Sequence, residues 1–404
     1  MQENSIRNWL KWGLLCLSLV AMYGFLMRYK IVFDLPQLQQ KNLMHAHSHL
    51  AFSGWVSHGL YGLLLLIMQP ILPRNANRFF GFLFIANFFC ALAMLPAFTL
   101  QGYGFWSILF STATIFVAFA FFIGISLHFK LLNAHFYVAK WIWAALFLHV
   151  ISSAGPGYLA YAMISKNIDS ELYLGSVYYY LHFQYSGWFF LAAMAIVLHF
   201  VKDLFQVPAY YLYIFFASSL ITFFLSILWA DLHPLLYILT LIATIAQTVL
   251  WFFMMWKYVP AFSKWKSHFS NGFYRLFTIA ILALSLKFIL QLISVIPDLS
   301  ELVFGIRPIV IAYLHLVLLG VYTLFLLGIF FQLGILKVAR LSAFLTIMFL
   351  IGVGLNELLL GAQGLFAFFY IPFPYVHHAL LGAASILFLS ASGLAAFAFF
   401  TKKS

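Results

Sequence analysis

The stretch MHAHSHLAFSGW, residues 44–55, places three histidines at the start of a long apolar run. The run continues to about residue 68, so this segment is long enough to cross the hydrocarbon core of a bilayer as one helix. Ionisable groups inside a membrane are costly and are by default candidates for function. His45, His47 and His49 are therefore candidate ligands for a metal or cofactor. The alternative is that they are only polar residues at the membrane–water interface.

Apolar runs of similar length recur along the whole chain, which is 65% hydrophobic and only 7% charged. A soluble domain could not bury that much apolar surface. We therefore predict an all-α polytopic membrane protein with about twelve transmembrane helices in one membrane domain, residues 1–404. The predicted spans are approximately 9–28, 44–68, 78–100, 105–128, 138–164, 174–201, 208–230, 234–256, 273–296, 308–333, 338–362 and 375–400.

The basic residues predict how these spans are oriented. With a cytoplasmic N-terminus, fifteen of the 21 lysines and arginines fall on inner segments, five fall on outer segments, and Lys287 lies within a span. This bias follows the positive-inside rule, and it accounts for the net charge of +12 without a nucleic-acid partner. We expect an integral protein of the bacterial inner (cytoplasmic) membrane, with both termini cytoplasmic and the lipid bilayer as its surroundings.

The histidine stretch has counterparts further along the chain. Residues 49–55 read HLAFSGW, residues 182–188 read HFQYSGW and residues 315–320 read HLVLLG, so that His49, His182 and His315 lie 133 residues apart. A fourth copy, HHALLG, begins at His377. Regular spacing of this kind indicates an internal repeat. We predict three pseudo-repeats of four helices each, about 1–135, 136–268 and 269–404, with a histidine at the start of the second helix of each.

Both parts of the repeated pattern have a physical interpretation. The glycine five residues after each histidine allows a neighbouring helix or a flat ring to approach the backbone closely. A single histidine near a helix end is more simply explained as an interfacial residue bonded to water. Three at equal spacing favour ligands, because neutral imidazole is the commonest protein ligand for metals and for haem iron.

Twelve helices in three four-helix units, with histidines at the start of helices two, six and ten, resemble subunit I of the haem-copper oxidases, a superfamily that includes the nitric-oxide reductases. The resemblance implies a b-type haem bound by two histidines. It assigns the helix-two ligand to His49, with His45 and His47 as competitors. The helix-ten ligand is His315 in YLHLVLL, where Tyr313 replaces the first histidine of the family's H-x-H.

The part of the resemblance that concerns oxygen reduction is incomplete. His182 lies where the family has a copper ligand, but Ser186 stands where nitric-oxide reductases have a glutamate. The span at 208–230 lacks a histidine pair, so copper is expected only if His377 and His378 supply the missing ligands. The chain also resembles the NnrS-like membrane proteins, which bind haem and copper and are associated with nitric-oxide stress.

Further candidates lie deeper in the spans or beside them. His58 follows His47 by eleven residues, on nearly the same helix face and about 16 Å deeper by helix rise, so it is either a ligand for an inner cofactor or a buried hydrogen-bonded residue. His149 lies in the middle of the span at 138–164, beside a predicted proline kink, and is a further candidate functional residue. Arg307 precedes His315 by about 12 Å of helix and is expected to meet haem propionates or to anchor the helix at the interface.

Two charges fall well inside the predicted spans, Lys287 and Glu357. Opposite charges at membrane depth often pair, and the alternative is that Glu357 passes protons or binds a quinol headgroup.

The resulting hypothesis is a membrane haem protein in respiratory electron transfer or in nitric oxide and oxygen handling, with a quinol or a cytochrome c-like donor and a partner subunit as candidate partners. Oxidoreductase activity of the haem-copper oxidase or nitric-oxide reductase type is the enzymatic expectation. The alternative is a multi-span transporter or channel that uses its buried histidines and Glu357 for proton or ion coupling.

Overall fold

The computed structural model describes residues 1–166, 169–230, 232–264, 266, 269–297, 299 and 305–401. Within these residues it is all-helical, and twelve helices are long and apolar enough to cross a membrane. Their bounds are Glu3–Val32, Gln40–Met68, Arg74–Gln101, Phe105–Leu127, Ala139–Ser165, Ser170–Phe200, Ala209–Ile227, Pro234–Ala261, Asn271–Ile293, Arg307–Gln332, Arg340–Phe368 and Val376–Phe400. The prediction of a twelve-span all-α membrane protein is confirmed.

Three of the spans share an unusual backbone. The second consists of α2 (Gln40–His49), a π-helix η1 (Leu50–Ser57) and α3 (His58–Met68). The sixth consists of α9 (Ser170–His182), the π-helix η2 (Phe183–Trp188) and α10 (Phe189–Phe200). The tenth consists of α15 (Arg307–His315), the π-helix η5 (Leu316–Thr323) and α16 (Leu324–Gln332). Each π-helix begins directly after a histidine of the 133-residue spacing. Such wider turns are rare and often occur at functional sites.

Each π-helix has a polar side chain bonded to one of its backbone carbonyls. Asn87 donates to the carbonyl of Ser53 in η1 at 3.0 Å, and Ser219 donates to that of Ser186 in η2 at 3.2 Å. Within η5, Thr323 donates to the carbonyl of Leu318 at 2.8 Å. Inside a membrane, backbone carbonyls must find their hydrogen-bond donors within the protein. In each π-helix one such carbonyl accepts from a side chain of the chain itself.

The glycines of the pattern lie where helices approach closely. A β-carbon on Gly54 would lie 2.5 Å from a methyl carbon of Leu50 and 3.4 Å from both Ala91 and Cys16. A β-carbon on Gly187 would lie 3.0 Å from Leu148. The small residue thus lets η1 and η2 pack tightly against neighbouring helices, as the sequence predicts. In the fourth copy the helix is plain α, and Gly382 has no such neighbour within 4 Å.

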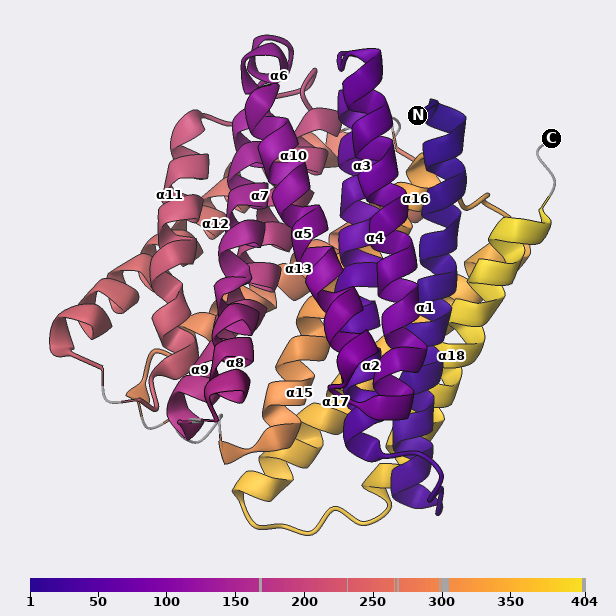
Figure 1. Cartoon of the computed structure of the whole chain (residues 1–404), viewed down its shortest axis with the longest axis vertical. Coiled ribbons are helices and arrows are strands. Elements are labelled where there is room, and N and C mark those ends of the chain that lie inside the picture. The colour runs from indigo at the N-terminus through magenta and orange to yellow at the C-terminus, as the bar shows by residue number, and fades with distance from the viewer. Residues whose placement is uncertain are drawn as a thin grey trace. The chain divides into compact units, whose positions relative to one another are not determined.

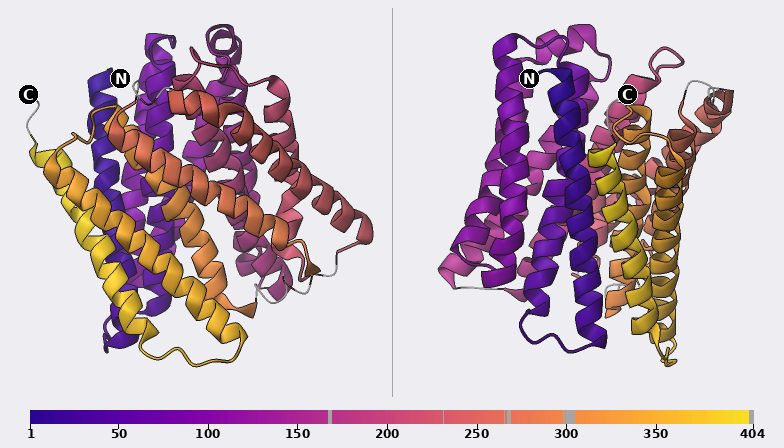
Figure 2. Two further views of the ribbon diagram at one scale, coloured as in Figure 1. Left: turned by 180° about the vertical axis from the view of Figure 1, so that it is seen from behind. Right: turned by 90° about the vertical axis from the view of Figure 1, so that its right-hand side faces the viewer.

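The chain divides into two compact units. The first comprises residues 1–117, 269–280 and 308–404. In it α1 (Glu3–Val32) packs along α18 (Val376–Phe400), as Figure 1 shows, and α18 packs along α17 (Arg340–Phe368), as Figure 2 shows. The helix α4 (Arg74–Gln101) lies against α2 and η1. The second span therefore has neighbours on several sides within this unit.

The second unit comprises residues 118–268 and 281–307. In it α7 (Ala139–Ser152) packs against η2 and α10, while α8 (Ala154–Ser165) packs against α9. The helix α11 (Ala209–Ile221) continues into a 3₁₀ segment, η3 (Thr222–Ile227), and both contact α12 (Pro234–Lys264). A short helix, α6 (Phe129–His135), precedes α7, and α5 (Phe105–Leu127) and α13 (Asn271–Ile293) contribute residues to both units.

Candidate functional site

His47 of α2 and His315 of α15 lie within electrostatic reach of one another in the first unit. Arg28, near the end of α1, acts electrostatically on both rings. All three side chains are half-buried. Two imidazoles and one guanidinium, from α1, α2 and α15, are therefore within electrostatic reach of one another.

The two rings are held in the same way. Nδ1 of His47 donates to the carbonyl of Val20 in α1 at 2.9 Å, and Nδ1 of His315 donates to the carbonyl of Ile311 at 2.8 Å. A carbonyl can only accept, so each Nδ1 carries the proton and each Nε2 keeps its lone pair. Histidines that bind metals usually donate their second N–H to a backbone carbonyl or carboxylate in this manner. In both rings the lone pair of Nε2 is thus not used by the bond to the backbone.

A second contact places these two spans in matched register. Trp55 lies eight residues after His47 and Thr323 lies eight residues after His315, and Trp55 Nε1 donates to Thr323 Oγ1 at 2.8 Å. Both side chains are buried. The bonded pair therefore has the same sequence offset from His47 in the second span as from His315 in the tenth.

His49, to which the resemblance assigns the helix-two ligand, faces elsewhere. Its ring stacks on Phe98 of α4 with centroids 4.3 Å apart and 14° between the planes. His45, one turn earlier, lies edge-on to Tyr103 at 4.7 Å, and the two histidines interact electrostatically. Among the described residues Nε2 of His45 is buried without a hydrogen-bond partner. The structure therefore places His45 and His49 on the α4 side of α2.

His58 is fully buried and occupies the expected face. Its Nε2 donates to the carbonyl of Trp9 in α1 at 3.0 Å, and its ring stacks on Phe84 at 4.3 Å. His47 bonds to Val20 and His58 bonds to Trp9, and the two residues of each helix are eleven positions apart. Both histidines thus bond to α1, which agrees with the interpretation of His58 as a buried hydrogen-bonded residue. Its Nδ1 has no hydrogen-bond partner in the described part of the chain.

His182, in the second unit, is held differently from His47 and His315. Its Nε2 donates to the carbonyl of Ser219 at 2.8 Å, so the nitrogen that most often binds metal carries the proton here. The side chain is buried and is influenced electrostatically by Lys287. In the pseudo-repeat it corresponds to His49 and His315, but its ring is oriented toward α11.

His149 belongs to a polar cluster of α7 and η2. Gln184 Nε2 donates to His149 Nδ1 at 2.9 Å and lies 2.7 Å from Ser152 Oγ, to which it also donates. The His149 ring stacks on Trp188 with 4.9 Å between centroids and 7° between planes. Gln184 was not singled out from the sequence, although it is the only polar residue between His182 and Ser186 apart from Tyr185.

The two intramembrane charges each have a polar partner on their own helix. Lys287 is buried, and its Nζ donates to Gln291 Oε1 at 2.6 Å. Asn356 Nδ2 donates to Glu357 Oε1 at 3.2 Å. The structure shows no ion pair between these two described side chains, and the hydrogen-bond partner of each is a neutral amide.

The remaining candidates lie at helix starts. Arg307 is exposed at the start of α15, and His377 and His378 are exposed in the first turn of α18. Over the residues that the structure describes, no three histidine, cysteine, aspartate or glutamate side chains form a group that could hold a metal ion. The copper site expected from His182, His377 and His378 stays a prediction.

Comparison of the chain with protein-family models finds no match, and comparison with curated proteins finds none either.

Proposed function

We propose that the chain is a membrane haem protein in which His47 and His315 are the axial ligands of one b-type haem. The observation that carries the proposal is their geometry: two imidazoles within electrostatic reach of each other, on two spans joined by the Trp55–Thr323 hydrogen bond, each with Nδ1 bonded to a backbone carbonyl. Haem iron is commonly held by histidine in this way. His47 therefore replaces His49 as the proposed helix-two ligand.

Arg28 is the residue that we expect to bind the haem propionates, because its charge acts on both ligand rings. A guanidinium binds carboxylates through paired, charge-assisted hydrogen bonds. Arg307 is exposed and lies eight residues before His315, so it would reach a propionate only at the helix entrance.

A haem held between two histidines supplies reversible one-electron chemistry. The contribution of the chain itself is to fix both rings in the tautomer whose Nε2 can bind iron. With the resemblance to haem-copper oxidase subunit I, this supports a role in respiratory electron transfer or in nitric oxide and oxygen handling, with a quinol or a cytochrome c-like protein as donor.

The test is a pyridine haemochrome assay with visible spectra on protein purified from haem-replete cells. We expect b-type haem in the wild-type protein and loss of the low-spin spectrum in His47→Ala and His315→Ala. His49→Ala is the matched control, since it removes an imidazole from the same helix and should keep the spectrum. Exogenous imidazole should restore haem to His47→Gly, which separates ligand loss from misfolding.

Two results would overturn these assignments. Wild-type protein without haem would end the proposal as a whole. A spectrum lost in His49→Ala and kept in His47→Ala would return the ligand role to His49.

The transporter alternative is favoured by one observation, the buried Lys287 with its partner Gln291 in α13 and its electrostatic contact with His182. Buried charges mark ion and proton pathways in membrane proteins. Proton flux into proteoliposomes that is abolished by Lys287→Met, in protein without bound haem, would support this function.

A further inference from the structure

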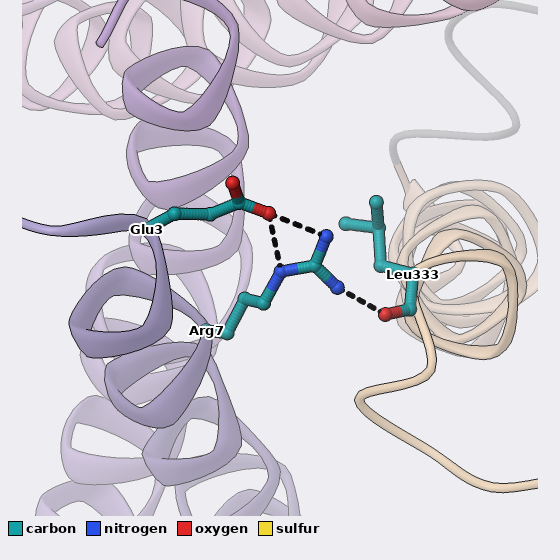
Figure 3. Close-up of polar contacts among 3 residues, drawn as sticks. All are labelled: Glu3, Arg7 and Leu333. Carbon is teal, nitrogen blue, oxygen red and sulfur yellow. Dashed lines mark hydrogen bonds and ion pairs between the residues drawn. The ribbon is translucent and has the colours of Figure 1, made fainter. Parts of the chain in front are cut away.

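Several polar side chains of the first unit are satisfied by other groups of the chain. Near the N-terminus, Arg7 forms an ion pair with Glu3 at 2.7 Å and donates to the backbone carbonyl of Leu333 (Figure 3). Further along α1, backbone carbonyls accept from His47 at 2.9 Å and from His58 at 3.0 Å. A buried polar group without such a partner lowers stability, so each exception calls for an explanation.

His45 and His49 are exceptions on the same helix. Within the residues that the structure describes, neither ring forms a hydrogen bond, and Nε2 of His45 is buried without a partner. The two residues lie four positions apart in the α-helix Gln40–His49, so their side chains are neighbours on one face. They also act on each other electrostatically. Two adjacent imidazoles on α2 therefore have no protein group bonded to their nitrogens.

The same two aromatic rings flank both imidazoles. The centroid of Phe98 in α4 lies 4.3 Å from that of His49 and 6.1 Å from that of His45. The centroid of Tyr103, two residues after the end of α4, lies 4.7 Å from that of His45 and 6.3 Å from that of His49. Both imidazoles are thus held at one place beside the end of α4.

The spacing of the pair is one that binds metal ions. In the zinc motif H-E-x-x-H, histidines at positions i and i+4 of a helix hold one ion from the same face. Residues 45–49 read HAHSH, so both ligand positions are present, and Ala46 stands where the motif has its general base. The pair is therefore suited to binding an ion rather than to hydrolysis. Imidazole nitrogen suits zinc and the neighbouring transition metals, whereas calcium and magnesium prefer oxygen ligands.

We propose that His45 and His49 together bind one divalent transition-metal ion of the zinc class, with water in its remaining coordination positions. Two protein ligands are fewer than the three of catalytic zinc sites, so the ion should exchange readily. Lys41, one turn before His45, acts electrostatically on that ring, and its charge opposes the bound ion. The site does not depend on the proposed haem, because neither residue is one of the proposed haem ligands.

The experiment is isothermal titration calorimetry of the detergent-solubilised, tag-free full chain with zinc chloride, and calcium chloride is titrated in parallel. The test variants are His45→Ala and His49→Ala. The matched control is His47→Ala, which removes an imidazole from the same helix on the side that bonds to α1. A second control, His377→Ala/His378→Ala, removes two exposed imidazoles of α18. Far-UV circular dichroism checks that each variant is folded.

We expect one zinc ion to bind at the pair. Each test variant should raise its dissociation constant at least about tenfold, since even residues that only orient a metal ligand have effects of that size. Both controls should change it less than about twofold. Wild-type protein that binds no zinc, equal losses in the test variants and the controls, or calcium that binds as tightly as zinc would overturn the proposal.

A surface variant tests the same site without removing a buried side chain. Lys41 is exposed, so Lys41→Gln should leave the fold intact even if a histidine variant is unstable. Removing its charge should tighten zinc binding roughly two- to fivefold, the range of an exposed charge interaction. Zinc affinity that is unchanged in Lys41→Gln would place the ion away from His45 and would contradict the proposed location.

Discussion

The hydrogen bond between Trp55 and Thr323 joins the two spans that carry the proposed haem ligands, and its removal is a direct test of their register. The substitution Thr323→Val keeps the shape of the side chain and removes the hydroxyl. That hydroxyl accepts from Trp55 at 2.8 Å and donates to the carbonyl of Leu318 at 2.8 Å. Both hydrogen bonds are therefore lost together.

The size of the effect follows from these two bonds. A hydrogen bond contributes about 1 kcal/mol net, so Thr323→Val should lower the free energy of unfolding by about 2 kcal/mol. Trp55→Phe removes the same inter-span bond from the other side. In a double-mutant cycle the coupling between the two positions should be about 1 kcal/mol, within the range measured for hydrogen bonds between membrane helices.

The assay is reversible unfolding in mixed micelles of increasing dodecyl sulfate content, monitored by far-UV circular dichroism, for the four proteins of the cycle. Trp251 and Ser285 form the matched control, since Trp251 donates to Ser285 at 2.9 Å within the second unit. Ser285→Ala should also destabilise the chain, but only Thr323→Val should broaden or shift the low-spin haem spectrum. Coupling below about 0.3 kcal/mol would mean that the two positions are independent and would refute the register argument.

Three further predictions use other contacts. Arg28→Gln should weaken haem retention about tenfold, which corresponds to one lost charge-assisted bond, and Arg28→Lys should restore part of it in the haemochrome assay. Gly187→Ala should lower the thermal unfolding temperature, because its β-carbon would lie 3.0 Å from Leu148 and overpacking costs about 1–3 kcal/mol; Gly157→Ala, with no atom within 4 Å, should be neutral or stabilising. Burial raises the pKa of Tyr137, which lies between spans. Above about pH 10 the phenol ionises in the unfolded chain but stays neutral in the folded chain, so stability should fall as the pH rises above about 10. Tyr137→Phe should reduce that fall in unfolding curves recorded between pH 9 and 11.

The twelve spans were predictable because a helix that crosses a bilayer needs about 20 consecutive, mostly apolar residues, and such runs are easily recognised in the sequence. Which of the two histidines, His47 or His49, lies within electrostatic reach of His315 was not predictable. In the α-helical segment Gln40–His49 the periodicity of the helix places these two residues on different faces, and this much follows from the sequence. His47 and His49 are both only half-buried, however, and the packing of α1 and α4 against α2 decides which of them lies within electrostatic reach of His315.

The π-helices were also beyond a sequence argument. The histidine–glycine spacing marks their positions, but hydrophobic periodicity carries no information where nearly every residue is apolar, and residues 50–57 are all buried. The partners of Lys287 and Glu357 were likewise undetermined, because each charge hydrogen-bonds to an amide residue on its own helix, Gln291 and Asn356, and not to the other charge.

The three π-helices have a consequence for the history of the chain. A π turn has one residue more than an α turn, and a π-helix begins directly after His49, His182 and His315 alike. If the repeats arose by duplication of a four-helix ancestor, one insertion before the duplications accounts for all three π-helices. Insertions after the duplications would have to occur independently at the same position in each repeat. On this account the widened turn is older than the twelve-helix protein, and the plain α-helix that begins at Val376 carries the histidine–glycine spacing without it.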